Sequence, residues 1–249
     1  MSHNPLVIKD GALFVADVHF NPNRREFLEF LTDIKSGKLE ATQLFLMGDI
    51  FDFLSSEIEY FVSQNKVLID LINQLSNKIE VFYFEGNHDY NLSSLFPNLL
   101  VFKRELQPII FKWDKKNVAL AHGDIFTPVG YSIYTKIIRN HQLLLFLNMC
   151  DKNNWLTKKI DFWLRDKYIS HMFSDFDSFA SSRIENYKNN IDADIFIEGH
   201  FHQGNFFQNN DTKKLYLNLP AFGVEHSYMR IEDGEIHLAC YLDPAPHRS

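Results

Sequence analysis

Five short segments of the chain carry side chains that bind metal ions or transfer protons. Carboxylates and imidazoles together are typical ligands of Mn²⁺, Fe or Zn²⁺, and the lack of a thiolate in these segments argues against a structural zinc site. A single Asp-x-His pair is more often an ordinary polar contact, so the prediction depends on all five segments occurring together. In chain order the segments are Asp17-Val-His19, Gly48-Asp49-Ile-Phe-Asp52, Gly86-Asn87-His88-Asp89, His122-Gly-Asp124 and Gly199-His200-Phe-His202.

Each segment directly follows a short apolar run that is typical of a buried strand. The stretches RREFLEFLTDIK and EIEYFVSQNKVLIDLINQLSNK, between the first three runs, have hydrophobic residues at helical spacing, which predicts strand–helix–strand units with parallel strands. Ligands of such sheets bind beyond the carboxyl ends of the strands, so we expect the five segments to converge on one crevice. Three of them begin with a glycine, which permits a tight turn at that point. The runs are ALFVA before Asp17, LFLM before Gly48, VFYFE before Gly86, NVALA before His122 and IFIE before Gly199.

The whole chain, residues 1–249, is interpreted as one domain of the α/β class. After residue 200 the apolar residues alternate and an Asp-Gly turn occurs at 233–234, which predicts antiparallel strands. Residues from about 129 to 190 contain few strand signals and many helical ones, so we interpret them as a helical insertion. No internal repeat and no Gly/Ser-rich linker marks a domain boundary at the edges of this insertion.

Composition and charge exclude several classes of protein. The net charge of -7 gives no general attraction to nucleic acid, so no nucleic-acid partner is expected. Cys150 and Cys240 lie far apart and outside any CxxC pattern, so no disulfide framework is predicted. The N-terminus lacks the pattern of an export signal, and no apolar run approaches the ~20 residues of a membrane span. We therefore expect a cytoplasmic protein.

The five segments resemble the calcineurin-like metallophosphoesterases, whose pattern is D-x-H, G-D-x-x-D, G-N-H-D/E, a later H, and G-H-x-H. The resemblance covers residues 17–202 and implies two packed mixed β-sheets flanked by helices, a four-layer αββα arrangement. It also implies two divalent metal ions, for which we expect Mn²⁺, with Fe or Zn²⁺ as alternatives. The ligands implied for one ion are Asp17, His19, Asp49 and His202, and those for the other are Asp49, Asn87, His122 and His200.

This set of ligands predicts a hydrolytic reaction at phosphorus. Two divalent ions about 3.5–4 Å apart lower the pKa of a shared water and clamp the oxygens of an in-line displacement. Asp49 would bridge the ions, and the resemblance supports His88 as the group that donates a proton to the leaving oxygen or stabilises the phosphoryl charge. Asp52 and Asp89 are interpreted as groups that orient the histidines, with an ordinary salt bridge or turn role as the alternative.

The sequence of the insertion bears on the substrate. On a helical wheel of KNNWLTKKIDFWLRDKYISHMF, a core stripe contains Leu156, Ile160, Trp163 and Leu164, whereas Trp155, Phe162 and Ile169 fall among charged residues. These residues form a second apolar surface, which packs on a neighbouring helix or contacts an apolar ligand or the edge of a membrane. The segment from Leu143 to Leu147 is too short to span a bilayer.

An apolar, partly basic helical insertion at this place is similar to the lid of the subgroup that hydrolyses UDP-2,3-diacylglucosamine in lipid A biosynthesis. That likeness implies a nucleotide-linked lipid as substrate, cleavage to UMP and 2,3-diacylglucosamine 1-phosphate, and peripheral contact with the cytoplasmic face of the inner membrane. The sequence does not indicate an oligomeric state. The candidate substrate contacts are Asn87, Asp124, Lys158, Lys159, Arg165 and Lys167.

Other functions of the same fold remain as alternatives. The best-known members of the subgroup have arginine after the asparagine of the third segment, whereas this chain has His88. A related lipid-precursor hydrolase fits this difference equally well. A general phosphodiesterase or nuclease would need a basic groove, and a phosphoprotein phosphatase would have no obvious use for an apolar lid. A non-catalytic protein-binding scaffold would be expected to have lost ligands that are present here.

Overall fold

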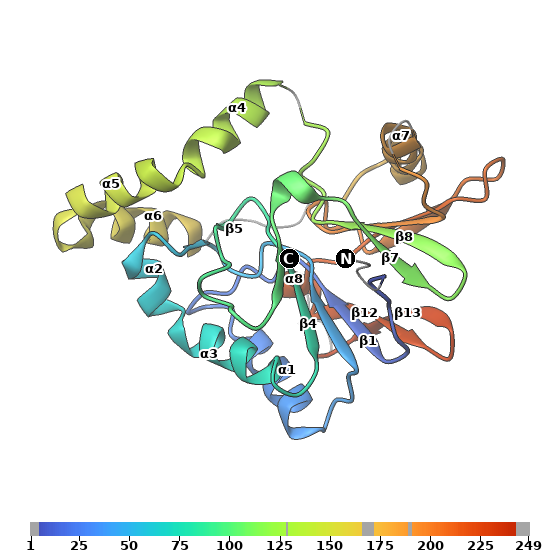
Figure 1. Cartoon of the computed structure of the whole chain (residues 1–249), viewed down its shortest axis with the longest axis horizontal. Helices are drawn as coiled ribbons and strands as arrows, with labels where there is room; N and C mark the ends of the chain where they lie inside the picture. The colour runs from blue at the N-terminus through green and yellow to red at the C-terminus, as the bar shows by residue number, and fades with distance from the viewer. Residues whose placement is uncertain (1–4, 128, 166–171, 189–190, 243–249) are drawn as a thin grey trace.

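Two β-sheets pack face to face in the computed structural model, which describes residues 5–127, 129–165, 172–188 and 191–242 (Figure 1). The first sheet has six strands, in the spatial order β13 (Glu235–Cys240), β12 (Ser227–Glu232), β1 (Ala12–Val15), β2 (Gln43–Leu46), β4 (Glu80–Phe84) and β6 (Leu100–Phe102). The second has five, in the order β10 (Asn205–Gln208), β11 (Leu215–Asn218), β9 (Ile195–Glu198), β8 (Lys116–Ala121) and β7 (Ile109–Trp113). A small third sheet pairs β3 (Leu54–Ser55) with β5 (Asp89–Tyr90).

Helices lie on the outer faces of the two large sheets and in the insertion. The α-helices are α1 (Glu26–Ser36), α2 (Glu59–Gln64), α3 (Lys66–Leu75), α4 (Val129–Ile138), α5 (His141–Cys150), α6 (Trp155–Arg165), α7 (Phe176–Lys188) and α8 (Phe222–Glu225). Two short 3₁₀ helices are η1 (Arg104–Leu106) and η2 (Lys152–Asn154).

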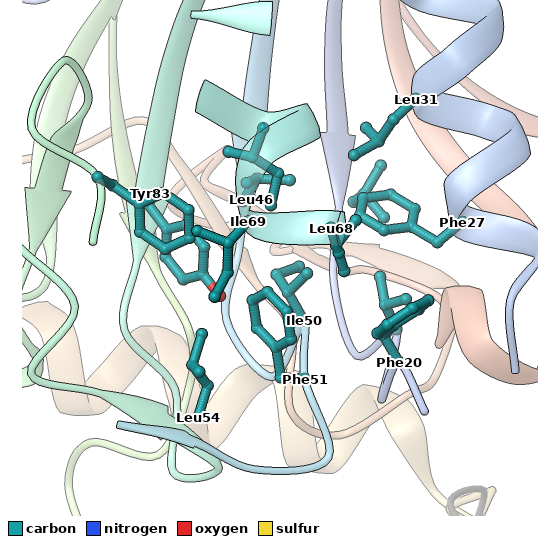
Figure 2. Close-up of a cluster of buried hydrophobic side chains, with 14 of the residues drawn as sticks. Phe20, Phe27, Leu31, Leu46, Ile50, Phe51, Leu54, Leu68, Ile69 and Tyr83 are labelled. Carbon is teal, nitrogen blue, oxygen red and sulfur yellow. The ribbon is translucent and has the colours of Figure 1, made fainter. Parts of the chain in front are cut away.

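Side chains of the central strands alternate between separate cores. Leu13 and Val15 of β1 belong to the core beneath α1 and α3, which Figure 2 shows in close-up. Phe14 points instead toward the second sheet and stacks on Phe45 of β2, with ring centroids 4.2 Å apart. On the outer face of the second sheet, Phe196 packs beneath α7. The layers are therefore helix, sheet, sheet and helix, which confirms the predicted αββα arrangement.

Helix α1 follows directly from its apolar spacing. Phe27, Phe30, Leu31 and Ile34 recur at intervals of three and four residues and are the buried residues of this helix. Burial of each such side chain contributes about 1.5–3 kcal/mol of transfer free energy. Gly37 ends the helix with φ of 81°, a conformation that glycine adopts without steric cost.

The second predicted helical stretch, residues 57–78, forms two helices because the chain breaks at Asn65. The Asn65 backbone has φ of -97° and ψ of 6°, and its Nδ2 donates a hydrogen bond to the carbonyl oxygen of Phe61 at 2.9 Å. Asparagine side chains compete in this way with the backbone ladder of a helix. The break separates α2 from α3.

The five predicted strands all form, and the first three have the predicted parallel direction. The runs before Asp17, Gly48 and Gly86 are β1, β2 and β4, which are parallel neighbours in the first sheet. The runs before His122 and Gly199 are β8 and β9, parallel neighbours in the second sheet. The predicted turn at 233–234 joins the antiparallel strands β12 and β13. The five motifs thus leave two different sheets on the same side.

Helices α4, α5 and α6 project away from the sheets on one side of the molecule (Figure 1). Leu144 of α5 is buried and Ile160 of α6 packs against the first core, so the projection is attached to the body by few apolar contacts. The prediction of a core stripe on α6 is wrong for Leu156 and Trp163, whose exposed fractions are 39% and 66%, whereas Thr157, at 5%, is buried. Helix α7 lies within the predicted 129–190 range but packs on the second sheet. None of the described helices has the length and apolarity to cross a bilayer.

Candidate metal centre

The structure brings the seven sequence-predicted metal ligands together at the carboxyl ends of the strands. Ligand atoms of Asp17, His19 and His202 lie within 4.8 Å of one another, and so do those of Asp49, His122 and His200. Asn87 joins the second group, since its Oδ1 lies 3.3 Å from Nε2 of His122. His88 was not predicted as a ligand, yet it forms a third group with His19 and Asp49.

Two glycines leave the space that these side chains occupy. A Cβ atom on Gly86 would lie 2.2 Å from Oδ1 of Asp49, and one on Gly48 would lie 2.3 Å from Nδ1 of His122. Gly48 also has φ of +90°, as the predicted tight turn requires, whereas Gly86 has no such φ and is needed only for the close approach. Any larger residue at either position would displace a predicted ligand.

Strained backbone is concentrated at the same strand ends. Five of the seven predicted ligands have φ between 49° and 64°, although none is glycine; they are Asp17, His19, Asp49, His200 and His202. A non-glycine residue held in this region costs on the order of 1–3 kcal/mol, and such residues cluster at active sites. The fold therefore stores strain in order to aim these side chains at one another.

The orientation and the electrostatics of His122 fit a cation site. Its Nδ1 lies 2.9 Å from the carbonyl oxygen of Met47, which leaves Nε2 facing Asp49 and Asn87. Burial lowers the pKa of His122, but Asp49 and the neighbouring carboxylates raise it to about 10. Burial raises the pKa of Asp49, but His122 and His88 lower it well below its usual value, so this carboxylate is ionised. Buried carboxylates that favour a proton on His122 also favour divalent cations, so these residues suit a pair of metal ions.

Asp89 holds the backbone of two ligand loops rather than a histidine. Its carboxylate accepts hydrogen bonds from the N–H groups of Asp49 at 3.0 Å and Gly86 at 2.9 Å, and from the hydroxyl of Tyr83 at 2.6 Å. Burial and the charge of Asp49 raise the pKa of Asp89 to about 7. The sequence predicted that Asp89 orients a histidine, but the groups that it contacts are backbone amides and the Tyr83 hydroxyl.

Asp52 contacts a predicted ligand directly. Its Oδ1 lies 3.4 Å from Nδ1 of His19, its carboxylate accepts a hydrogen bond from Asn21, and Arg24 lies 3.4 Å away. The carbonyl oxygen of Asp52 lies 2.7 Å from Nδ1 of His88. One residue thus contacts both imidazoles, through its side chain and its backbone carbonyl.

Asp124 is completely buried and paired with arginine. Its Oδ2 lies 2.7 Å from Nε of Arg104 and 3.7 Å from Nη2 of Arg139. Arg139 also donates to the carbonyl oxygen of Gly86, beside Asn87. The carboxylate of Asp124 is therefore engaged inside the protein, and Arg139, between α4 and α5, links the insertion to the centre. No sequence pattern distinguished these two arginines from surface residues.

A second cluster missed in the sequence lies beneath the loops of His122 and His200. Arg183 of α7 pairs with Glu198, the residue before Gly199, and Tyr216 donates to the same carboxylate at 2.7 Å. The only signal was a charged residue at the end of the apolar run IFIE, since a buried charge needs a partner.

The predicted substrate contacts on the insertion are exposed or lie outside the described side chains. Lys158 donates to the carbonyl oxygen of Asn153 at 3.0 Å, and Lys159 lies over the rings of Trp155 and Trp163 at 5.6 and 5.1 Å. Arg165 ends α6, but its side chain is not among those described, and Lys167 lies outside the described residues.

Comparison with known proteins agrees with this geometry. The model of the calcineurin-like phosphoesterase family matches residues 12–204. A UDP-2,3-diacylglucosamine hydrolase of Vibrio atlanticus is 26% identical over 80% of this chain and 85% of its own length, and one of Histophilus somni is 29% identical over 79% and 86%. Among solved structures, an Escherichia coli phosphoesterase is 16% identical, with a TM-score of 0.43 over 93% of this chain and 99% of its own.

The family match covers the strands that carry all five motifs, and the structure places their side chains within ligand distance of one another. The chain belongs to the calcineurin-like phosphoesterase family and is a metal-dependent hydrolase of phosphoric esters or anhydrides.

Proposed function

We propose that this protein hydrolyses UDP-2,3-diacylglucosamine to UMP and 2,3-diacylglucosamine 1-phosphate, a step of lipid A biosynthesis. The relatives that carry this name align with most of the chain, including the insertion. The observation that carries the proposal is an apolar insertion tied to the loop of Asn87 and His88. Arg139 reaches the carbonyl oxygen of Gly86, and Asn91 donates to the carbonyl oxygen of Arg139 at 3.1 Å.

The residues of the centre have separate tasks in this reaction. Two divalent ions, proposed to be Mn²⁺, would activate a water and neutralise charge on the phosphate oxygens when bound. Asp49 would hold both ions, and the remaining predicted ligands would complete the two sites. His88 has Nδ1 fixed by the carbonyl oxygen of Asp52, so its Nε2 is the atom that donates a proton or hydrogen bond to the leaving oxygen.

The insertion supplies apolar surface for the acyl chains. Exposed apolar side chains occur on all three projecting helices; among them are Ile133, Ile137, Phe146, Met149, Trp155 and Phe162. Surface of this kind is unusual on a protein that binds only polar substrates. Arg104, which contacts Asp124, and Arg139, which contacts Gly86, are proposed to stabilise the diphosphate.

Peripheral contact with the cytoplasmic face of the inner membrane is part of the proposal. Trp155, Phe162 and Trp163 are each about two-thirds exposed, and Lys158 and Lys159 lie beside them on α6. Aromatic and basic side chains on one helix are typical of a surface that enters the lipid headgroup region. The fraction of protein that sediments with anionic vesicles should decrease when Trp155→Ser, Phe162→Ser and Trp163→Ser are combined. An unchanged fraction would exclude this surface as the membrane contact.

The decisive experiment measures product release. Protein with Mn²⁺ is expected to release UMP from UDP-2,3-diacylglucosamine faster than it cleaves bis(p-nitrophenyl) phosphate, a phosphopeptide or single-stranded DNA. An Asp49→Asn variant serves as the control for contaminating activity. If no UMP is released and one of the other three substrates is cleaved rapidly, the proposed function is wrong. The protein is then a general phosphodiesterase, a phosphatase or a nuclease, according to the substrate that is cleaved.

A further inference from the structure

A pocket of about 210 Å³ lies beside the metal centre, between α1, the α2–α3 junction and α6. We propose that it binds the uracil base of the substrate and selects uracil over cytosine; this inference rests on the proposed function. The side chains that carry the argument are Phe20, Arg25, Asp52, Phe53, Asn65 and Asp161.

The pocket and the metal centre share a wall. Asp52 lines the pocket, and its Oδ1 lies 3.4 Å from Nδ1 of the predicted ligand His19. Phe20, the residue after His19, lines the pocket as well, and Figure 2 shows its ring beside Phe51 and Ile50. In a uridine nucleotide only the ribose separates the base from the α-phosphorus. A base in this pocket would therefore leave that phosphorus beside His19 and His88.

The walls of the pocket suit a flat aromatic ring with polar edges. Phe20, Phe53 and Phe61 supply apolar and aromatic surface, and stacking of a base on such a ring is worth about 1–3 kcal/mol. Asp161 of α6 is fixed by a hydrogen bond from the hydroxyl of Tyr60 at 2.9 Å. This bond joins the insertion to α2 at the rim of the pocket.

Asn65 provides the element that distinguishes the bases. Its Nδ2 is used within the protein, where it donates to the carbonyl oxygen of Phe61 at 2.9 Å. Asn65 lines the pocket and no described residue donates to its Oδ1, so we assign this oxygen as the acceptor for the base. Uracil presents an N3–H donor, whereas cytosine presents an acceptor at N3. An acceptor at this position therefore receives a hydrogen bond from N3–H of uracil, whereas N3 of cytosine finds no donor there.

Arg25 supplies the complementary donors. Its side chain is exposed at the rim of the pocket and makes no hydrogen bond or ion pair with any residue in the described part of the chain. A guanidinium can donate to a carbonyl oxygen of the base without losing an existing partner. The neighbouring Arg24 is engaged with Asp52, so the two adjacent arginines have different tasks.

The pocket and helices α4 and α5 of the insertion reach the centre through different loops. Asp52 and Phe20 link the pocket to the loops after β2 and β1, whereas Arg139 links α4 and α5 to the loop after β4 through the carbonyl oxygen of Gly86. A substrate with a nucleoside at one end and acyl chains at the other can then place its diphosphate between these loops.

Binding of UMP and CMP to the Mn²⁺-loaded protein tests the proposal by calorimetry. The wild type is expected to bind UMP at least about tenfold more tightly than CMP, the ratio that one unpaired buried group produces. Asn65→Leu should bring the two affinities within about threefold of each other, and Arg25→Gln should weaken UMP binding by roughly three- to tenfold. Lys35→Gln, on α1 but outside the pocket, is the matched control and should change neither affinity.

Kinetics provide the second readout. Arg25→Gln and Asn65→Leu should raise KM for UDP-2,3-diacylglucosamine by roughly three- to tenfold and leave hydrolysis of bis(p-nitrophenyl) phosphate, which lacks a base, unchanged. The unchanged rate also shows that the variants are folded. Equal affinity of the wild type for UMP and CMP, or equal effects of the variants on both substrates, would overturn the pocket assignment. Base selectivity that depends on Asn65, without hydrolysis of UDP-2,3-diacylglucosamine, would support the pocket and refute the proposed function.

Discussion

Arg183 and Glu198 form a buried, two-point ion pair, with Nε 2.9 Å from Oε2 and Nη2 2.5 Å from Oε1. The same guanidinium donates to the carbonyl oxygens of Gly123 and Ile125, each at 3.1 Å. Glu198 is the last residue of β9, and Gly123 follows His122. Helix α7 therefore clamps the loop of His122 to the strand end that precedes His200.

Replacement of Arg183 by methionine tests this clamp. Loss of one partner leaves the Glu198 carboxylate buried without its cation, so the free energy of unfolding should fall by about 3–5 kcal/mol in urea titrations. Lys188→Met, which removes an exposed pair with Glu185 on the same helix, should cost less than about 1 kcal/mol. Similar losses for the two variants would contradict the clamp.

Gly86→Ala should damage the centre. The new Cβ atom would lie 2.2 Å from Oδ1 of Asp49 and 2.5 Å from its backbone nitrogen, so the carboxylate must move away from the ions that it is proposed to bridge. We expect kcat to fall by a factor of about 100 or more, because a displacement of about 1 Å has effects of this size. Gly130→Ala is the control, since its Cβ would meet nothing within 4 Å. Equal rates for both variants would show that Asp49 tolerates the shift.

Removal of divalent ions should abolish activity and lower stability together. The ions bind only the folded arrangement of ligands from five separate loops, so Mn²⁺ at about 100 times its dissociation constant should stabilise the fold by about 2.7 kcal/mol. Activity and melting temperature are measured after chelation and again after addition of Mn²⁺. The wild type should regain both, whereas Asp49→Asn should regain neither. Full activity after exhaustive chelation would refute the metal centre.

His88→Ala should affect esters more than anhydrides. A phosphate leaving group is much less basic than an alkoxide, so it depends less on a proton from Nε2 of His88. We expect kcat to fall by about 10²–10⁴-fold for an alkyl phosphodiester and by a smaller factor for UDP-2,3-diacylglucosamine. Metal content measured on the same preparations separates this role from ligation, because His88 lies within ligand distance of His19 and Asp49. Loss of bound metal in the variant would assign His88 to the ions.

Glu57 should make the attachment of the insertion dependent on pH. Burial raises the pKa of Glu57, but hydrogen bonds with Ser55 and His141 lower it below 4.5, its usual value. The lowered folded-state pKa means that the contribution of Glu57 to stability is complete above pH 4.5 and disappears as pH falls through the lower value.

The variant Glu57→Gln isolates this contribution. It should lose about 1–3 kcal/mol of unfolding free energy near pH 7, and the difference from the wild type should vanish in strong acid. Urea titrations between pH 7 and 3 measure the difference, with the exposed Glu40→Gln as the control. A constant difference across this range would show that the Glu57 carboxylate is not ionised in the folded protein.

Much of the site could be predicted because each ligand belongs to a local pattern. An apolar run followed by glycine and polar residues predicts both a buried strand and its functional end, and the runs before Asp17, Gly48 and Gly86 became adjacent parallel strands. The spacing of apolar residues also predicted α1. The partners of Asp89 could not be predicted in this way, because its carboxylate accepts a hydrogen bond from a backbone amide far away in the chain.

The sequence by itself determined which residues are the candidate metal ligands, the strands that carry them and the order of helices between those strands, since all of these depend on spacing over a few residues. Only the tertiary structure decided that Arg183 clamps two ligand loops, that Trp163 is exposed while Thr157 is buried, and that a pocket opens beside Asp52. The reason is that a long-range contact depends on how separate elements pack, and a single charged or aromatic side chain has no periodicity that reveals its partner.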